Sequence, residues 1–363
     1  MRVLIIASGD LWAGAEVMVY QLACGLAAVT GLELCLVLLN NERLAKELRK
    51  IGVEVHIVDE SKHSFLAIVR AISRLVAVFS PDVIHSHRYK ENLLAWLVTR
   101  CMRKVRLIST RHGMPELAGR DIDIPARLRA WLSFRLLSCF FDCTVVVSEE
   151  MLQSLVGSYG FTDKGVKVIY NGIYLPETLI QHANIRMTVG SAGRLFPVKD
   201  YSLMVEIAKL VVAQSDKVDF VLAGDGPERH MLEEKVRKAG LHGRFKFLGH
   251  QDDMDIFYKS LDVYINTSVH EGIPMSVLEA MSYGLPVLVP KVGGFPEIVE
   301  EGLSGYLIDD RDPSVFADRC VGLLSDPEKR EQMSKAARQR VINHFSREAM
   351  ATQYYQLYRK LLS

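Results

Sequence analysis

Short apolar runs alternate with segments of helical periodicity along the chain, which is the pattern of a doubly wound parallel sheet. In the first half, apolar runs lie at 2–7, 32–39, 53–58, 82–86, 105–110, 142–147 and 166–170. Helices are expected between them at 14–29, 42–51, 64–79, 91–102, 125–139 and 149–159. Runs that are apolar at nearly every position are typical of strands buried on both faces. The pattern therefore predicts an α/β fold.

The alternation breaks after Asn171-Gly172, where turn residues, Pro176 and a polar stretch precede Arg186. A second alternating region starts at Met187, and a final helix is expected at about 347–361, behind a serine cap at Ser346. A chain of 363 residues can form two separate cores. We therefore predict a boundary near 172, with a second domain from 173 to 346.

Composition excludes several classes of protein. A net charge of +1 argues against a dedicated nucleic-acid binder, so no nucleic-acid partner is expected. Six cysteines, at 24, 35, 101, 139, 143 and 320, form no C-x-x-C pair, which is typical of reduced core thiols in a cytosolic protein. The first apolar run, at 3–7, is too short for a signal peptide or a membrane span. We expect a cytoplasmic protein.

The stretch 268–290 has the strongest chemical signal. An apolar run at 261–266 leads into a loop and then a short helix, Met275 to Tyr283, for which Pro274 is expected as the first residue and Gly284 as the stop. Free backbone N–H groups and the positive dipole end at such a helix N-terminus suit an anion, most often a phosphate.

Two carboxylates, Glu271 and Glu279, flank this predicted anion site. They would repel phosphate, but they can accept hydrogen bonds from hydroxyls on either side of a diphosphate. Two cations, Arg194 and Lys199, follow another predicted strand and can neutralise the same diphosphate. Solvated surface charges remain the alternative for all four residues.

Glycines and histidines at predicted strand ends supply further candidates. Gly224 and Gly226 would let a base or ribose approach the backbone, or would simply make a turn. His85 and His87 would share one face of a strand, which suits a zinc site, a binding surface or an ordinary structural role. Since no third ligand is visible nearby, no metal site is predicted there.

Positive charge dominates the stretch from Arg88 to Arg135, which we call the basic segment. Its cations are Arg88, Lys90, Arg100, Arg103, Lys104, Arg106, Arg111, Arg120, Arg127, Arg129 and Arg135, against Glu91, Glu116, Asp121 and Asp123. The part from 100 to 135 could contact an anionic membrane peripherally, since it contains no spanning run. The alternatives to membrane contact are that the segment forms a solvated basic face or attracts a phosphorylated acceptor.

Several of these motifs resemble those of the family-4 retaining glycosyltransferases. They are Glu271-Gly272-Ile273-Pro274 with Glu279 in E-x7-E spacing, Gly193-Arg194-Leu195 followed by Lys199-Asp200, and Gly14-Ala15-Glu16, in which Ala13 replaces a family glycine. The resemblance implies the GT-B fold, in which two Rossmann-like domains face each other across a cleft. Residues 1–172, completed by the last helix at 347–363, would bind the acceptor, and 173–346 the donor.

The resemblance also implies an activity and a set of residue roles. The enzyme would move a hexosyl or N-acetylhexosaminyl group, with retention, from a nucleotide diphosphate sugar, UDP being favoured, to a hydroxyl of a glycan or lipid-linked acceptor. The pathway would be cell-surface glycan, lipopolysaccharide or glycolipid biosynthesis. The catalytic candidates are His112, Arg194, Lys199 and Glu271, and the donor-binding candidates are Gly14, Gly193, Arg194, Lys199, Gly224, Gly226, Gly272, Ile273, Pro274, Met275, Ser276 and Glu279.

Three alternatives stay open at this stage: a sugar-nucleotide epimerase, a phosphorylase and a catalytically silent sugar-nucleotide sensor. No tightly bound cofactor is expected. The D-x-D motif by which another glycosyltransferase fold holds a metal occurs as Asp121-Ile122-Asp123 and Asp253-Met254-Asp255. Neither follows a confident strand directly, so turnover is expected to be metal-independent.

Overall fold

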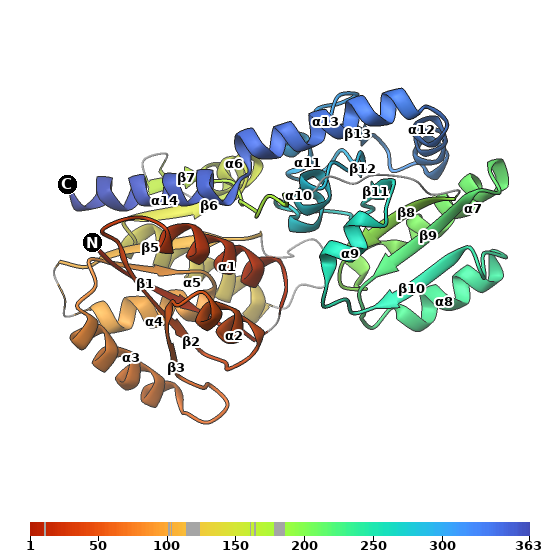
Figure 1. The fold of residues 1–363 in the computed structure, drawn as a ribbon. Coiled ribbons are helices and arrows are strands. Elements are labelled where there is room, and N and C mark those ends of the chain that lie inside the picture. Colours follow the sequence, from red (N-terminus) through yellow and green to blue (C-terminus); the bar gives the residue numbers. More distant parts are fainter. Residues whose placement is uncertain are drawn as a thin grey trace. The chain divides into compact units, whose positions relative to one another are not determined.

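Two parallel β-sheets, of seven and six strands, organise the part of the chain that the computed structural model describes, namely residues 1–10, 12–100, 102, 104–113, 124–159, 161–162, 165–177 and 186–363 (Figure 1). The chain divides into two compact units. Unit 1 comprises Met1–Gly172 and Arg347–Ser363, and unit 2 comprises Ile173–Ser346. Each unit is an α/β assembly, which confirms the predicted fold class.

Unit 1 contains the seven-stranded sheet, in the order β3-β2-β1-β4-β5-β6-β7. Its strands are β1 (Arg2–Ala7), β2 (Glu33–Leu38), β3 (Glu54–Ile57), β4 (Val83–Ser86), β5 (Arg106–Arg111), β6 (Cys143–Val146) and β7 (Val166–Val168). All neighbours are parallel, and Ile5 of β1 pairs with Leu36 on one side and His85 on the other. The strand order therefore reverses between β1 and β4.

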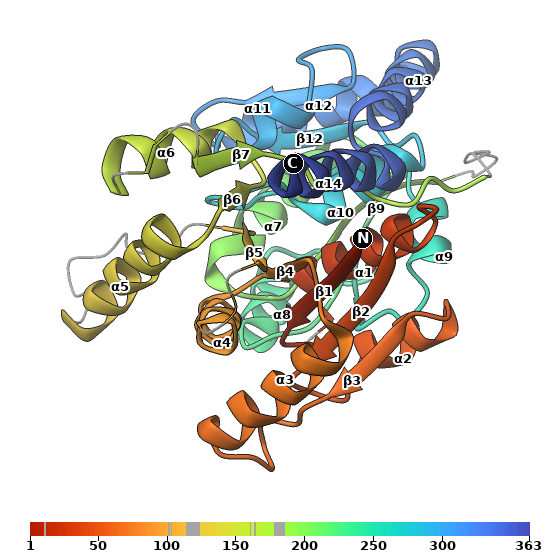
Figure 2. The ribbon, with the colours of Figure 1, turned by 90° about the vertical axis from the view of Figure 1, so that its left-hand side faces the viewer.

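Helices cover both faces of this sheet, as its apolar strands require. They are α1 (Gly14–Ala27), α2 (Arg43–Lys50), α3 (Phe65–Phe79), α4 (Tyr89–Thr99), α5 (Ile124–Phe140), α6 (Glu149–Tyr159) and the C-terminal α14 (Arg347–Leu362). Ile68 of α3 and Leu94 of α4 share one core with Ile84 of β4. Helix α14 lies beside α1 (Figure 2), so closely that a Cβ on Gly25 would meet that of Ala351 at 2.5 Å.

Unit 2 contains the six-stranded sheet, in the order β10-β9-β8-β11-β12-β13. Its strands are β8 (Met187–Ala192), β9 (Val218–Ala223), β10 (Phe245–Gly249), β11 (Val263–Ile265), β12 (Val287–Pro290) and β13 (Gly305–Ile308). Its helices are η2 (Pro197–Lys199), α7 (Tyr201–Gln214), α8 (Arg229–Lys238), α9 (Met254–Lys259), α10 (Met275–Ser282), α11 (Phe295–Ile298), α12 (Pro313–Ser325) and α13 (Pro327–His344). Here the strand order reverses between β8 and β11.

The alternation of side chains along β11 separates the two faces of the unit 2 sheet. Val263 and Ile265 join the core with α7 and α12. Tyr264, which points the opposite way, packs near Tyr258 of α9 with ring centroids 6.1 Å apart. Helices α9 and α10 therefore lie on the face away from α7.

Several predicted helix starts differ from the observed ones by one or two residues. Pro274 is the N-cap of α10 rather than its first residue, because its ψ of 116° is extended. Helix α4 begins at Tyr89 rather than at 91, because the extended residue Arg88 already precedes its first turn. Gly284 ends α10 as predicted, and its φ of 79° is a conformation that glycine adopts readily.

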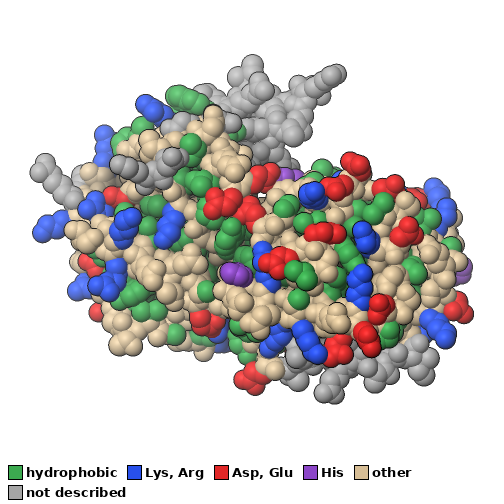
Figure 3. Space-filling model, turned by 90° about the horizontal axis from the view of Figure 1, so that it is seen from above, with side chains coloured by type: hydrophobic (Ala, Val, Ile, Leu, Met, Phe, Trp, Pro, Cys, Tyr) green, Lys and Arg blue, Asp and Glu red, His purple; other side chains and the backbone are tan. Residues whose placement is uncertain are grey.

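On the face shown in Figure 3, lysine and arginine side chains are interspersed with aspartate, glutamate and hydrophobic ones. Among the described helices, none is long and apolar enough to cross a membrane.

Candidate active site

The candidate residues of unit 2 gather where its strand order reverses. Arg194 and Lys199 follow β8, Glu271 follows β11, and Glu279 lies on α10, the next helix along the chain. In open parallel sheets, ligands bind outside the carboxyl ends of the strands at such a reversal. The topology thus gives these four residues the position expected of binding groups.

Lys199 and Glu271 are in direct contact. The Lys199 ammonium forms an ion pair with Oε1 of Glu271, and the Ser268 hydroxyl donates to the same oxygen at 2.8 Å. The loop after β8 is tied to the loop after β11 by a second contact, because the Thr267 hydroxyl donates to the Lys199 carbonyl at 2.9 Å. The structure therefore brings together two candidates that are 72 residues apart in sequence.

The loop that contains Glu271 and Gly272 rests on the loop after β12. The Gly294 N–H donates to the Glu271 carbonyl at 3.0 Å. A Cβ on Gly293 would meet that carbonyl oxygen at 2.0 Å, and a Cβ on Gly294 would meet the Gly272 carbonyl at 1.9 Å. Because the carbonyl groups of Glu271 and Gly272 occupy the space that a side chain would need, only glycine fits at 293 and 294 without a shift.

Gly193, Gly224 and Gly226 serve close packing of the same kind. A Cβ on Gly224, whose φ is +127°, would meet the Gly193 carbonyl oxygen at 1.9 Å. A Cβ on Gly226 would meet the Leu195 carbonyl at 2.6 Å, and one on Gly193 would meet the Tyr201 hydroxyl at 2.6 Å. Contact between loops thus accounts for these glycines, and their contact with a nucleotide stays a prediction.

Glu279 is held among aromatic rings. The Tyr258 hydroxyl donates to its Oε2 at 2.7 Å, and Tyr283 stacks on Tyr258 with centroids 5.2 Å apart. Desolvation raises the pKa of Glu279 to about 7, although the Tyr258 hydrogen bond opposes that rise. A carboxylate in this state gains from any further donor, such as a ribose hydroxyl.

Arg194 remains available to a ligand. Its side chain is exposed, and its guanidinium lies 5.0 Å from the centre of the Phe196 ring. The remaining candidates of this stretch, Ile273, Pro274, Met275 and Ser276, lead into and begin α10, and only Ser276 of them is not buried.

His112 lies in unit 1, beside His87. Nδ1 of His87 is 3.1 Å from Nε2 of His112, and the second ring nitrogen of each is buried without a hydrogen-bond partner. Desolvation lowers the pKa of His112 to about 3 and that of His87 well below its usual value. Both rings are therefore neutral at physiological pH.

His85 ties the sheet of unit 1 to α14. Its Nδ1 lies 2.7 Å from the Tyr358 hydroxyl, and its Nε2 lies 2.8 Å from the Thr110 hydroxyl, which bonds to Tyr354 in turn. Since both of its nitrogens are engaged, His85 has a structural role, and the H-x-H pair does not offer two open ligands for zinc.

Several cations of the basic segment have partners in unit 1. Arg88 and Lys90 form ion pairs with carboxylates, and Arg106 pairs with Asp142 at 2.9 Å. Arg111 packs over a phenylalanine ring, and burial lowers its pKa to about 10. The side chains at 103, 120, 127 and 129 lie outside the described residues.

Both aspartates of Asp253-Met254-Asp255 are engaged in contacts within unit 2. Asp253 is the N-cap of α9 and accepts from the N–H groups of Asp255 and Ile256. Asp255 pairs with Lys259 at 2.7 Å and accepts from the Tyr283 hydroxyl at 2.8 Å. Asp121 and Asp123 lie outside the described residues.

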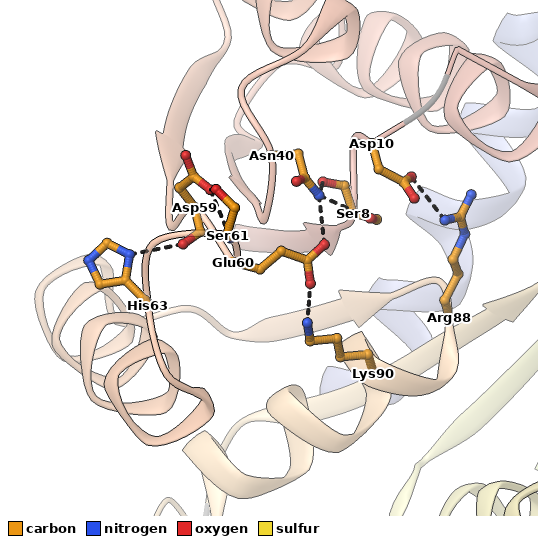
Figure 4. Close-up of polar contacts among 9 residues, drawn as sticks. All are labelled: Ser8, Asp10, Asn40, Asp59, Glu60, Ser61, His63, Arg88 and Lys90. Atoms are coloured by element: carbon orange, nitrogen blue, oxygen red, sulfur yellow. Dashed lines mark hydrogen bonds and ion pairs between the residues drawn. The ribbon is translucent and has the colours of Figure 1, made fainter.

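A polar cluster that the sequence pattern did not predict lies at the carboxyl edge of the unit 1 sheet. It includes Asp10, Asn40, Glu60, Arg88 and Lys90, from loops and helices that follow four different strands (Figure 4). Helix α1, which follows β1, begins at Gly14. The available signal was that polar residues follow β1, β2, β3 and β4, but only the strand order shows that they meet.

The chain thus has two Rossmann-like units, each with candidate residues at the carboxyl edge of its sheet, as the GT-B fold requires. Two family models match the chain: "Glycosyltransferase Family 4" at residues 12–175 and "Glycosyl transferases group 1" at residues 181–340. The chain therefore belongs to the family-4 glycosyltransferases with the GT-B fold, and it is a glycosyltransferase.

Individual relatives agree with this assignment. N-acetyl-alpha-D-glucosaminyl L-malate synthase from Bacillus anthracis is 25% identical over 313 residues, which are 82% of this chain and 79% of the relative. D-inositol 3-phosphate glycosyltransferase from Corynebacterium efficiens is 27% identical over 304 residues, 76% of this chain and 70% of the relative. Among solved structures, HepE from Anabaena in complex with UDP and glucose superposes with a TM-score of 0.85, at 20% identity and 99% coverage of both chains. That similarity shows a shared fold.

Proposed function

We propose that this glycosyltransferase moves a hexosyl or N-acetylhexosaminyl group from a nucleotide diphosphate sugar, with UDP favoured, to an acceptor hydroxyl with retention of anomeric configuration. The observation that carries the proposal is the contact between Lys199 and Glu271 where the strand order of unit 2 reverses, with Glu279 on the helix that follows. The HepE complex, which has the same fold, contains UDP and glucose and supports a nucleotide sugar as co-substrate.

In this proposal the donor lies along the β8 and β11 loops. Glu279 accepts hydrogen bonds from the ribose hydroxyls, since its carboxylate is desolvated and has one protein donor in Tyr258. The N-terminus of α10 and the cations of Arg194 and Lys199 face the diphosphate. They stabilise the negative charge that grows on the leaving group as the sugar departs.

The ion pair between Lys199 and Glu271 suggests how the donor sugar is held. Without a ligand, each group neutralises the other. A diphosphate gives Lys199 a stronger partner, which leaves the Glu271 carboxylate to accept from sugar hydroxyls. The backbone from Gly272 to Ser276 contributes further donors beside it.

His112 acts as a neutral hydrogen-bonding group toward the sugar rather than as a cation, because its pKa is near 3. No candidate residue is assigned as a covalent nucleophile. Retention then follows if the acceptor attacks from the face that the diphosphate leaves, with the leaving phosphate taking the proton of the acceptor hydroxyl.

For the acceptor we propose a glycan or lipid-linked molecule of cell-surface glycan, lipopolysaccharide or glycolipid biosynthesis, bound by unit 1. The protein would act in the cytoplasm, with any membrane contact peripheral. Transfer would need no divalent metal and no tightly bound cofactor, because cationic side chains and a helix N-terminus carry the diphosphate charge.

A thermal-shift screen with nucleoside diphosphates and their sugars tests the donor assignment. UDP and a UDP-sugar should raise the melting temperature more than ADP or GDP, because a ligand that binds only the native state stabilises it. Proton NMR of the glycoside formed should then show the anomeric configuration of the donor. Inverted product would refute retention, and binding without transfer to any acceptor would favour a sugar-nucleotide sensor.

A further inference from the structure

Three side chains with metal-binding atoms lie together on β2 and β3 of unit 1. Cys35 of β2 pairs directly with Glu54 of β3, and His56 follows two residues further along β3. Successive side chains of a strand point to opposite faces, so Glu54 and His56 share the face on which Cys35 lies. We call these three residues the Cys35 cluster.

The Cys35 cluster lies away from the candidate active-site residues of unit 1. Val37 and Val58, which continue the same rows of side chains, share a core with Ile68 of α3, so α3 covers this face of the sheet. Glu54 is the first residue of β3, which places the cluster toward the amino ends of the strands. The polar cluster of Figure 4, in contrast, follows their carboxyl ends.

The ligand atoms of the Cys35 cluster are close enough to share one metal ion. A sulfur, a ring nitrogen and a carboxylate oxygen all lie within 4.8 Å of one another. Nε2 of His56 lies 2.7 Å from Oε1 of Glu54. Around a tetrahedral zinc ion, the corresponding ligand atoms are about 3.3–3.6 Å apart. Small shifts of the Glu54 and His56 side chains would therefore give this geometry.

Burial and charge both favour a cation at this position. Cys35 is 1% exposed, whereas the side chains of Glu54 and His56 are 59% and 38% exposed, so an ion can approach from solvent. Burial, together with the Glu54 carboxylate, raises the pKa of Cys35 to about 12. A bound metal ion reverses this effect, because its positive charge deprotonates a coordinating thiol.

We propose that Cys35, Glu54 and His56 bind one Zn²⁺ ion, with a water molecule as the fourth ligand. This inference does not depend on the proposed function. Thiolate and imidazole select zinc over magnesium and calcium, and zinc accepts three protein ligands with one water. As the Zn–S bond forms, the thiol proton of Cys35 passes to the buffer, and the imidazole of His56 carries its proton on Nδ1 so that Nε2 can bind the metal.

Zinc at the Cys35 cluster would stabilise one edge of the unit 1 sheet. Strand β3 is the edge strand and pairs with β2 alone. A metal ion held by Cys35 of β2 and by two residues of β3 would link these strands by coordination as well as by their backbone hydrogen bonds. Since it binds only the folded form, it raises the stability of the protein.

Zinc titration into the metal-free full chain tests the proposal. Zn²⁺ should raise the melting temperature, whereas Mg²⁺ at the same concentration should change it little. Cd²⁺ should produce the ultraviolet charge-transfer absorption of a cadmium–thiolate bond. The dissociation constant for Zn²⁺, measured by calorimetry, should fall about tenfold from about pH 7 to 8, because one thiol proton is released.

Two matched pairs of variants locate the ion. Cys35→Ala and His56→Gln each remove one ligand and should weaken Zn²⁺ binding at least about a hundredfold. Cys143→Ala, at another buried cysteine of the same sheet, and His63→Gln, at an exposed histidine, should bind Zn²⁺ as the wild type does. Because the His56 side chain is partly exposed, His56→Gln should keep the metal-free melting temperature, so that its loss of binding reports the missing ligand.

The proposal is overturned if Zn²⁺ leaves the wild-type melting temperature unchanged or if Cd²⁺ gives no thiolate absorption. Equal metal responses in Cys35→Ala and Cys143→Ala would also overturn it, since the metal would then bind at other side chains. Wild-type affinity in His56→Gln would show that the three residues do not form one site.

Discussion

Lowering the pH from about 7.5 to 5.5 should weaken binding of a nucleotide sugar, because Glu279 takes up a proton. Desolvation raises its pKa to about 7, so the free protein loses the carboxylate form as the pH falls through that value. The proposed ribose contacts need the carboxylate, which accepts hydrogen bonds at both oxygens. Donor affinity is therefore greatest well above pH 7 and falls progressively as the pH drops below the pKa of the free protein.

The size of the effect follows from the two protonation states. If bound ribose hydroxyls return the pKa of Glu279 to its ordinary value of 4.5, the shift of about 2.5 units corresponds to at most about 3.4 kcal/mol. Linkage then predicts that the dissociation constant rises roughly twentyfold between about pH 7.5 and 5.5. It also predicts release of roughly 0.9 proton on binding near pH 6.

Isothermal titration calorimetry with UDP-glucose measures both quantities. UDP-glucose is preferable to UDP because its esterified diphosphate does not titrate in this range. Repeating the titration in buffers of different ionisation enthalpy yields the number of protons released. His85 and His112, whose pKa values are lowered to about 3, stay neutral throughout and do not contribute.

Two variants make the interpretation specific. Glu279→Gln should bind UDP-glucose with little dependence on pH. Glu91→Gln should retain the wild-type dependence, although burial also raises the pKa of Glu91 to about 7, because Glu91 lies in unit 1. Affinity that is constant with pH in the wild type, or the same dependence in Glu279→Gln, would refute the reasoning.

The remaining predictions concern catalysis, metals, membranes and packing. Arg194→Ala and Lys199→Ala should each lower kcat by on the order of 100- to 1000-fold with a smaller effect on donor affinity, and an unchanged kcat in steady-state assays would place the leaving group elsewhere. Turnover should survive EDTA, whereas complete loss restored by manganese or magnesium would contradict a metal-independent mechanism. Any retention of the protein on anionic vesicles should disappear at high salt, and retention that resists salt would point to hydrophobic insertion instead. Gly25→Ala should reduce the free energy of unfolding by about 1–2 kcal/mol, and so lower the melting temperature, because its Cβ would overlap that of Ala351. The control Gly322→Ala, whose Cβ would lie in open space on α12, should raise the melting temperature slightly.

Sequence pattern alone determined the two α/β regions and the position of the main motif. Strand and helix periods are local properties, so the alternation of apolar runs with helical segments predicted the two sheets. Pro274, Gly284 and the apolar runs around them located α10, which begins at Met275 as predicted and has Pro274 as its N-cap. The resemblance carried by Glu271, Glu279 and Arg194 then led to the family that the comparisons show.

Only the tertiary structure decided which charged groups face one another. Lys199 meets Glu271 because β8 and β11 are neighbours in the sheet although 72 residues separate the two side chains. Arg88 meets Glu16 across a separation of 72 residues and Asp10 across 78, because β4 lies beside β1. Strand order depends on packing of the whole unit rather than on local preference, so sequence pattern could not show that Arg88 and Lys90 of the basic segment are paired with carboxylates.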